Sequence, residues 1–388
     1  MKSRLKVAHL ATVDLGLLFV WPQLRALQSE GFEVQALCGD GPWVSAFEDE
    51  GIKVHVISAK RQIALLADAR LLWKLLSIMR REQYAIVHTH TPKMELIGQI
   101  AARLAGVPIV VYTNHGFIFR SQMSVLKQWL LVTLARIAGR ISDHILSQSS
   151  EDIATALERR IYPPTRISYL GNGINLAQLD ARRFAPDHVR LKKQEIGIRE
   201  DHQVVGMVGR YVWEKGYREF FEAAKLVCEG QSRVSFLTIG MPLASERDPV
   251  DFGMLKQLGI DDHVVVLKSR RDMPELYSVM DIVVLPSYRE GFPRTLMEAA
   301  AMSKPVVASD ISGCREVVQD GHNGFLVPVK DSQALAEKIQ HLLDDPELAA
   351  KFGQNGRRLA EERFDEAKVI ERVRNCYQTL LRQKFPAL

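Results

Sequence analysis

The stretch "DIVVLPSYREGFPRTLMEAAAMSKPVVASD", residues 281–310, spells out a strand, a turn, a helix and a second strand. The apolar run at its start predicts a buried strand, "TLMEAAAM" predicts a helix, and "PVVAS" predicts the next strand. Such a βαβ unit implies a parallel sheet. Glu290 follows the first strand in a turn with Gly291 and Pro293, and the carboxyl end of a strand is where doubly wound proteins bind ligands.

The same alternation runs through most of the chain. Further strand-like runs lie at 5–11, 32–38, 51–58, 84–91, 107–115 and 143–149, and the pattern restarts at 202–210, 234–240, 263–269 and 323–329. A chain of 388 residues exceeds one ordinary core. We therefore predict an α/β protein made of two Rossmann-like, doubly wound domains.

The expected domain boundaries follow from composition. The segment "IYPPTRISYLGNGIN" (161–175) is dense in Pro and Gly, and a charged stretch with little pattern follows it. We expect an N-terminal domain at 1–180, a hinge at 181–200 and a C-terminal domain at 201–365. The last segment, 366–388, is predicted to be helical.

The composition is that of a water-soluble globular protein, with 47% hydrophobic and 25% charged residues. No apolar run approaches the roughly 18–20 residues that a membrane span needs. The chain enters a strand pattern almost at once, so no signal peptide is expected. The four cysteines lie far apart without a CxxC pair, which argues against a disulfide framework and fits a reducing cytoplasm.

Positive charge is concentrated in one region. Residues 61–140 hold 11 lysines and arginines against 3 aspartates and glutamates, a formal charge of +8. Two helices are predicted there, at 70–82 with basic and apolar faces, and at 124–140, apolar nearly all round. They are either core-facing helices with basic rims or a surface that rests on an anionic membrane. Nucleic acid is not an expected partner, because no known binding module appears.

Two carboxylates flank the start of the helix in the opening stretch. Helix N-termini present free N–H groups and a partial positive charge, so they bind anions. Glu290 and Glu298 cannot both serve a phosphate there, because like charges repel. They are better suited to accept hydrogen bonds from hydroxyl groups on either side of it. A sugar joined through a diphosphate to a ribose offers that arrangement.

Two cations follow the strand that restarts the pattern, in "GRYVWEKG" (209–216). Arg210 and Lys215 lie at a strand's carboxyl end, where Arg supplies a rigid donor fork and Lys a point charge. Together they can neutralise a diphosphate leaving group without a metal. No Asp-x-Asp follows a strand, so no metal–diphosphate clamp is expected.

The first domain offers weaker signals. Gly16 follows the first strand and allows a phosphate to approach the backbone, and His115 lies at another strand end. His88 and His90 alternate on a strand and could chelate zinc, but no third ligand is evident, so no metal site is expected. Lining of an acceptor site by this strand end, with Lys93 as a phosphate contact, is the preferred interpretation.

Taken together, these motifs resemble the family 4 glycosyltransferases, retaining enzymes of the GT-B fold. "EGFPRTLMEAAAMSKPVVASDISGCREVV" resembles the family's Glu-x7-Glu block, and "GRYVWEKG" and "YLGNGIN" are similar to its other blocks. "HTHTPK" with "TNHGF" is similar to members that build bacterial surface polysaccharides, such as capsule or lipopolysaccharide, or lipid-linked oligosaccharides. The resemblance covers nearly the whole chain and implies two domains facing across a cleft. The domain at 1–180 would bind the acceptor, the domain at 201–365 would bind the nucleotide sugar, and 366–388 would cross back to the first domain.

The resemblance also implies roles. Arg210 and Lys215 would hold the donor diphosphate, Glu290 the transferred sugar and Glu298 the ribose. Other implied contacts are backbone donors from Gly291, Phe292 and Pro293, His115 beside the sugar, Gly16 over the phosphates, and the Lys268–Arg271 loop near the nucleobase. The sequence departs from the family pattern at Asp14–Gly16, where a Gly pair is common, and at Asn175, where Asp is usual.

The resulting hypothesis is retaining, metal-independent transfer of a hexose or N-acetylhexosamine. The expected donor is a nucleotide-diphosphate sugar, UDP-linked by preference, with no cofactor. The expected acceptor is lipid-linked or a glycan, and the expected location is the cytoplasm, with peripheral contact at the inner face of the cytoplasmic membrane.

No acid in the sequence clearly suits the role of a covalent nucleophile. The resemblance favours same-face attack, in which the leaving phosphate takes the acceptor's proton. A covalent sugar–enzyme adduct trapped with a slow donor would contradict that route. Three rival functions are a nucleotide-sugar 2-epimerase, active on the donor alone, a non-catalytic nucleotide-sugar-binding subunit and a nicotinamide dehydrogenase. The dehydrogenase lacks its Gly-x-Gly-x-x-Gly fingerprint.

Overall fold

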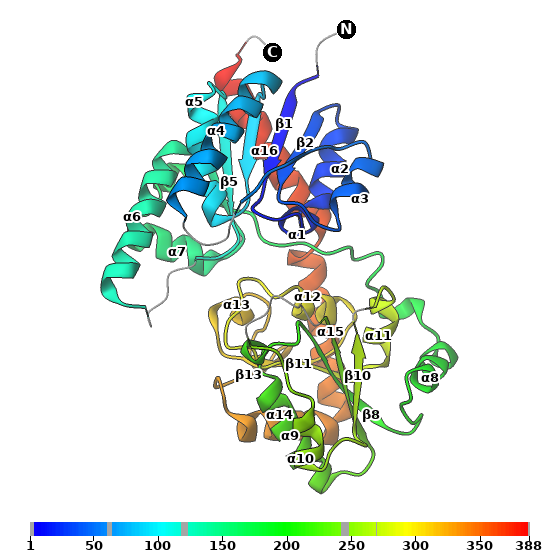
Figure 1. The fold of residues 1–388 in the computed structure, drawn as a ribbon. Coiled ribbons are helices and arrows are strands. Elements are labelled where there is room, and N and C mark those ends of the chain that lie inside the picture. Colours follow the sequence, from blue (N-terminus) through cyan, green and yellow to red (C-terminus); the bar gives the residue numbers. More distant parts are fainter. Residues whose placement is uncertain (1–3, 60–63, 118–122, 242–247, 269, 387–388) are drawn as a thin grey trace. The chain divides into compact units, whose positions relative to one another are not determined.

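The computed structural model describes residues 4–59, 64–117, 123–241, 248–268 and 270–386. These residues form two compact units. Unit 1 comprises Met1–Gly171 and Ala367–Leu388, and unit 2 comprises Asn172–Glu366. Each unit is a parallel sheet with helices on both faces, the predicted Rossmann-like architecture (Figure 1).

The sheet of unit 1 has seven strands in the order β3-β2-β1-β4-β5-β6-β7. Its strands are β1 (Lys6–Leu10), β2 (Glu33–Cys38), β3 (Lys53–Val56), β4 (Ile86–Thr89), β5 (Ile109–Asn114), β6 (His144–Ser147) and β7 (Ile167–Tyr169). Its helices are α1 (Leu15–Leu18), α2 (Trp21–Ser29), α3 (Val44–Asp49), α4 (Leu65–Glu82), the π-helix η1 (Met94–Gly98), α5 (Gln99–Leu104), α6 (Val125–Ile141), α7 (Ser150–Glu158), the short η2 (Pro164–Arg166) and α16 (Glu366–Lys384).

The sheet of unit 2 has six strands in the order β10-β9-β8-β11-β12-β13. Its strands are β8 (Gln203–Val208), β9 (Val234–Gly240), β10 (Val264–Lys268), β11 (Ile282–Leu285), β12 (Val306–Ser309) and β13 (Gly324–Val327). Its helices are η3 (Ala181–Arg183), α8 (Pro186–Glu195), η4 (Trp213–Lys215), α9 (Tyr217–Gly230), α10 (Gly253–Leu258), α11 (Met273–Val279), α12 (Arg294–Ala301), α13 (Ser312–Arg315), α14 (Ser332–Asp344) and α15 (Pro346–Arg363).

Alternation along each strand divides the core of unit 1 into two faces. Ala8, Leu10 and Val87 point toward α4, whereas Val7 and Ile86 pack with α2 and α16. Figure 1 shows α16, in red, lying along this sheet although it is the last element of the chain. Among the helices that the structure describes, none combines the length and apolar character that a membrane crossing requires.

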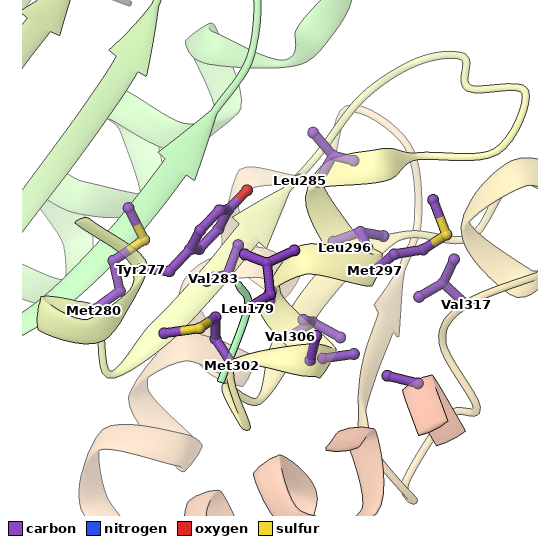
Figure 2. Packing of buried hydrophobic residues seen from close by; sticks show 14 of the residues in the cluster. Leu179, Tyr277, Met280, Val283, Leu285, Leu296, Met297, Met302, Val306 and Val317 are labelled. Atoms are coloured by element: carbon purple, nitrogen blue, oxygen red, sulfur yellow. The ribbon is translucent and has the colours of Figure 1, made fainter. Parts of the chain in front are cut away.

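The core of unit 2 that supports the opening stretch lies under α12. Figure 2 shows Leu296 and Met297 of α12 among Val283 of β11 and Val306 of β12, all in one buried cluster. This apolar face anchors α12, so the first turn of the helix is held at the carboxyl end of β11.

The segment expected to form a hinge is more ordered than its sequence suggests. β7 adds a strand to the first sheet within 161–175, and α8 forms within 181–200. Lys192 of α8 forms ion pairs with Asp272 and Glu275 at 2.9 and 2.8 Å, which fixes α8 on unit 2. The division of the structure therefore falls at 171/172, earlier than the boundary expected at 180/181.

Gly216 joins two neighbouring loops of unit 2. It ends η4 with φ +84°, a left-handed conformation that favours glycine. A Cβ there would lie 2.1 Å from the carbonyl oxygen of Pro286, just after β11. The absence of a side chain therefore lets the loop after β8 contact the loop after β11.

Substitution of Gly216 tests this contact. Gly259→Ala is the matched control, because Gly259 has φ +71° and a Cβ added there would meet no described atom within 4 Å. We expect Gly259→Ala to lower the free energy of unfolding by about 1–2 kcal/mol through backbone strain. Gly216→Ala should cost about 1–3 kcal/mol more through overpacking. Urea denaturation measures both, and equal losses would contradict the contact.

Candidate active site

The order of strands in unit 2 reverses between β8 and β11, which are hydrogen-bonded neighbours. From this point, β9 and β10 extend the sheet to one side, and β12 and β13 extend it to the other. The loops that follow β8 and β11 therefore diverge, which leaves the crevice where doubly wound sheets bind ligands. The first loop carries Arg210 and Lys215, and the second carries Glu290.

Lys215 and Glu290 form an ion pair across this reversal. Lys215 Nζ lies 2.5 Å from Glu290 Oε1, and the two side chains are only 18% and 11% exposed. Ser287 Oγ donates a second hydrogen bond to the same carboxylate oxygen at 2.7 Å. The cation and the hydroxyl hold this carboxylate at the carboxyl end of the sheet.

Glu298 lies one turn into α12, as predicted. Its Oε2 accepts a hydrogen bond from Tyr277 Oη at 3.0 Å, and its Oε1 accepts one from Arg294 Nε at 2.8 Å. Tyr277 is fully buried in the core below, so it fixes the carboxylate from beneath. Each carboxylate oxygen keeps a second lone pair for a further donor.

The first turn of α12 begins directly after the Glu290 loop. Pro293 is the N-cap, and no side chain of the described residues makes a capping hydrogen bond there. The expectation that Pro293 supplies a backbone donor is wrong, because proline has no N–H group. Gly291 and Phe292 can donate, and the Phe292 ring packs edge-on against Phe364 in the core, so only its backbone is available to a ligand.

The remaining predicted residues of unit 2 occupy the same edge of the sheet. Arg210 is half-buried after β8. Arg271 is exposed after β10, which lies two strands from β8, or about 10 Å at the usual strand spacing. Position 269 in the Lys268–Arg271 loop lies outside the described residues.

Gly16 follows the first strand, but its surroundings differ from those that the resemblance implied. It lies in the four-residue helix α1, whose N-cap is Asp14. The Asp14 carboxylate accepts hydrogen bonds from the backbone N–H groups of Leu15 and Trp43 at 2.7 and 2.9 Å. This helix start therefore already carries a carboxylate of its own, where the resemblance implied a phosphate.

Unit 1 gathers histidines at the corresponding reversal of its own sheet, between β1 and β4. His9 of β1 is buried beside His88 and His90, and one nitrogen of each of these three lies within 4.8 Å of the others. The sequence-based statement that no third ligand is evident beside His88 and His90 is therefore wrong, because His9 lies within reach of both. His115 lies next to His90, with Nε2 3.3 Å from His90 Nδ1.

Burial sets the charge of this cluster. It lowers the pKa of His9 to about 3 and the pKa of His115 to about 4, and it lowers the pKa of His88 and of His90 well below the usual value. A hydrogen bond with Gln148 partly opposes the shift at His115. The imidazoles are therefore neutral at physiological pH.

Lys93, interpreted from the sequence as a phosphate contact, forms an ion pair with Asp68. Its Nζ lies 2.7 Å from Asp68 Oδ1.

Several residues that shape these sites are absent from the sequence-based predictions. They are His9, Tyr277, Ser287 and Gly313. A Cβ on Gly313 would lie 2.6 Å from the carbonyl oxygen of Glu290, so a glycine is needed where α13 contacts the Glu290 loop. Of these four residues, only Ser287 could have been singled out from the sequence, because it lies three residues before Glu290 in the same turn.

A separate cavity of about 660 Å³ lies in unit 1 beside β6, β7 and α16. Its lining includes Arg166, Arg372 and Lys384 and none of the predicted site residues. It is therefore not the site that the motifs describe.

Comparison with known proteins identifies the class. The family model for glycosyl transferases group 1 matches residues 189–359, and the model for a glycosyl transferase 4-like domain matches residues 19–173. Together with the two doubly wound units, these matches define a glycosyltransferase of the GT-B fold.

Relatives and solved structures agree. The chain is 30% identical over 384 residues to the capsular polysaccharide biosynthesis glycosyltransferase CapM of Staphylococcus aureus, covering 99% of both chains. It is 28% identical to the Escherichia coli UDP-Gal:alpha-D-GlcNAc-diphosphoundecaprenol alpha-1,3-galactosyltransferase, covering 97% of both. The fold matches Anabaena HepE in complex with UDP and glucose with a TM-score of 0.82 at 23% identity, covering 97% of this chain and 100% of that one. The chain belongs to this glycosyltransferase family and is an enzyme of the hexosyltransferase class.

The histidine cluster predicts a specific dependence of stability on pH. The pKa of His9 is about 3 when folded and about 6.5 when unfolded, so between these values the unfolded state binds one more proton at this site. The contribution of the neutral His9 imidazole to the free energy of unfolding is therefore complete above pH 6.5. It is lost as the pH falls toward 3.

His9→Gln removes that proton from the balance. Between pH 6 and 4 we expect the free energy of unfolding of the wild type to fall by about 1.4 kcal/mol per pH unit more steeply than that of the variant. Urea denaturation of both proteins at several pH values measures this difference in slope. Both proteins have the same carboxylates, so the effect of carboxylate titration cancels in the difference. Parallel curves would show that His9 is protonated in the folded state.

Proposed function

We propose that this enzyme transfers a hexose or N-acetylhexosamine, with retention, from a UDP-sugar to a polyprenyl-diphosphate-linked glycan during assembly of bacterial surface polysaccharide. The observation that carries the proposal is the Lys215–Glu290 pair at the strand-order reversal of unit 2, with Glu298 one turn into α12. Two of the relatives are named for transfer to diphosphoundecaprenol-linked sugars, and one of those for a UDP-Gal donor.

The donor diphosphate is assigned to Arg210, Lys215 and the uncapped first turn of α12. Without ligand, Lys215 is neutralised by Glu290. A diphosphate would share this cation with the carboxylate, and Arg210 would add a second positive charge. These groups can stabilise the charge that grows on the leaving phosphate without a metal.

The two carboxylates are assigned to hydroxyl groups on either side of the diphosphate. Glu290, held by Lys215 and Ser287, accepts from the transferred sugar, and Glu298, held by Tyr277 and Arg294, accepts from the ribose. Arg271 is assigned to the nucleobase, because its position two strands from β8 suits the length of a nucleoside. His115, neutral in the folded protein, is assigned to the transferred sugar as a hydrogen-bonding group.

The acceptor side of the proposal rests on the surface of unit 1. α5 lies between α4 and α6 on one face of the sheet, and all three expose apolar side chains. The most exposed are Leu65, Leu66 and Trp73 on α4, Leu104 on α5, and Val125, Leu126, Trp129, Leu130 and Ile137 on α6. Leu126 is 76% exposed and Trp129 61% exposed, so the apolar character of α6 is only partly used by the core.

Basic residues accompany these apolar side chains. Arg70, Lys74, Arg80 and Arg81 are exposed on α4, and Lys127 and Arg140 are exposed on α6. Exposed Leu and Trp next to Lys and Arg are the combination by which a protein surface binds an anionic lipid interface. We therefore propose that this surface rests on an anionic membrane and brings the enzyme to its lipid-linked acceptor.

Nucleotide binding tests the donor site. We expect UDP at a hundredfold excess over Kd, without added metal, to stabilise the protein by about 2.7 kcal/mol, seen as a raised thermal midpoint. Lys215→Ala and Glu298→Ala should abolish most of the shift, because they remove a diphosphate contact and a ribose contact. Lys256→Ala and Glu337→Ala, two exposed positions of unit 2, are the controls. Loss of the shift in the controls, or no shift with any nucleoside diphosphate, would refute the assignment.

Vesicle binding tests the membrane surface. We expect the protein to sediment with phosphatidylglycerol-containing vesicles, less with pure phosphatidylcholine, and less in 0.5 M salt because screening weakens the basic contacts. The double variant Leu126→Ser, Trp129→Ser should reduce the affinity at least about tenfold, or about 1.4 kcal/mol. Leu191→Ser, at a position 59% exposed on α8 in unit 2, should have no effect. Equal losses in both variants would exclude this surface.

A further inference from the structure

A buried series of hydrogen bonds in unit 1 ends at His115, and no step of the proposed function uses its other members. Its members, in order, are Thr113, His88, Tyr377, His9, His90 and His115. We call this series the histidine chain. Its members before His115 are at most 2% exposed.

The sheet brings these residues together. β1, β4 and β5 are neighbours, and the register pairs His9 with His88 directly. His90 lies two residues beyond His88, so its side chain points to the same face. α16 covers this face and contributes Tyr377 from the far end of the chain.

The contacts are short along most of the chain. His88 Nε2 lies 2.7 Å from Thr113 Oγ1, and His88 Nδ1 lies 2.7 Å from Tyr377 Oη. Tyr377 Oη is 3.3 Å from His9 Nε2, and His9 Nδ1 is 2.9 Å from His90 Nε2. His90 Nδ1 lies 3.3 Å from His115 Nε2, which completes the series.

A neutral imidazole has one N–H donor and one acceptor nitrogen. The four histidines are neutral in the folded protein, so all donors in the series must point the same way, either toward His115 or away from it. A single reversed tautomer would leave two donors or two lone pairs facing each other. Because a buried polar group without a hydrogen-bond partner is strongly destabilising, the tautomers are coupled.

Thr113 selects the direction. Its hydroxyl has a proton of its own, and His88 is its sole hydrogen-bond partner within the described part of the chain. If the donors pointed away from His115, the Thr113 proton would be buried without an acceptor. If they point toward His115, Thr113 donates to His88 Nε2 and every member is satisfied. His115 Nε2 then accepts from His90, and His115 Nδ1 carries the proton.

We propose that Thr113, His88, Tyr377, His9 and His90 are positioning residues that hold His115 as its Nδ1–H tautomer, with this N–H presented as a hydrogen-bond donor. The role of that donor rests on the proposed function, in which His115 contacts the transferred sugar. A sugar hydroxyl or an N-acetyl carbonyl is the chemistry that such a donor recognises.

A metal ion is the competing explanation for three clustered histidines. Zinc would need a free lone pair from each. His88 uses both nitrogens on the hydroxyls of Thr113 and Tyr377, and His9 uses both on Tyr377 and His90. Metal binding would break these contacts, so the geometry favours the hydrogen-bonded series.

The first experiment uses the unmodified protein. Long-range proton–nitrogen correlation spectra of histidine-labelled protein distinguish Nδ1–H from Nε2–H imidazoles, and His115→Gln identifies the His115 signals. We expect His115 as a single Nδ1–H tautomer at pH 7.5. An Nε2–H tautomer at His115, or one equivalent of tightly bound metal by elemental analysis, would overturn the proposal.

The second experiment cuts the series at its centre. Tyr377→Phe removes only the hydroxyl between His88 and His9, and Tyr84→Phe removes an equally buried hydroxyl that donates to Gln35 at 2.7 Å. We expect Tyr377→Phe to give a mixture of His115 tautomers and to lower kcat about tenfold or more. The thermal shift with UDP, assigned to unit 2, should be unchanged. Tyr84→Phe should leave the tautomer and kcat unaltered.

The outcomes separate the two proposals. Equal effects of Tyr377→Phe and Tyr84→Phe on the tautomer would overturn the positioning role. If the tautomer responds as expected but no sugar is transferred from any donor, the proposed function fails while the histidine chain stands. If the enzyme transfers sugar while His115 is the Nε2–H tautomer, the positioning role fails and the proposed function stands.

Discussion

The ion pair between Lys215 and Glu290 spans the point where the strand order of unit 2 reverses, and the candidate donor site is arranged around it. The pair joins the loop after β8 to the loop after β11. Gly216 keeps these two loops close, and Gly313 of α13 lets that helix contact the Glu290 loop, because neither position has room for a Cβ. A carboxylate, a cation and an open helix start are thus held together by backbone contacts that do not depend on a ligand.

The two units fill equivalent positions with opposite chemistry. At the reversal of unit 2 the side chains are charged and partly exposed, which suits a diphosphate with hydroxyl groups on both sides. At the reversal of unit 1 the side chains are neutral imidazoles, buried and bonded to one another, and α1 is capped by Asp14. Burial disfavours charge, so unit 1 can orient a polar group but does not offer an anion the same attraction.

The outer surface of unit 1 follows a different constraint. α4 buries Leu71, Leu75 and Met79, as its sequence periodicity predicts, yet Leu66 and Trp73 remain exposed on its other side. α6 buries even less of its apolar surface. Both helices therefore carry more apolar area than the core of unit 1 accommodates, and the basic residues beside it give this surplus a preference for anionic surroundings.

The sequence by itself determined the class of fold, the strand-end positions of Glu290, Lys215 and His115, and the place of Glu298 in its helix. Period-two and period-3.6 patterns are local, and a parallel sheet puts every strand end on one edge. Only the tertiary structure decided the partners: Lys215 with Glu290 across 75 residues, and Tyr377 with His88 across 289. β7 and α8 were missed because Pro, Gly and charged residues obscured short elements that gain stability from packing. The sequence showed His88 and His90 as a pair, whereas strand register and a returning helix made them part of a six-membered series, since hydrogen bonds between distant segments leave no local pattern.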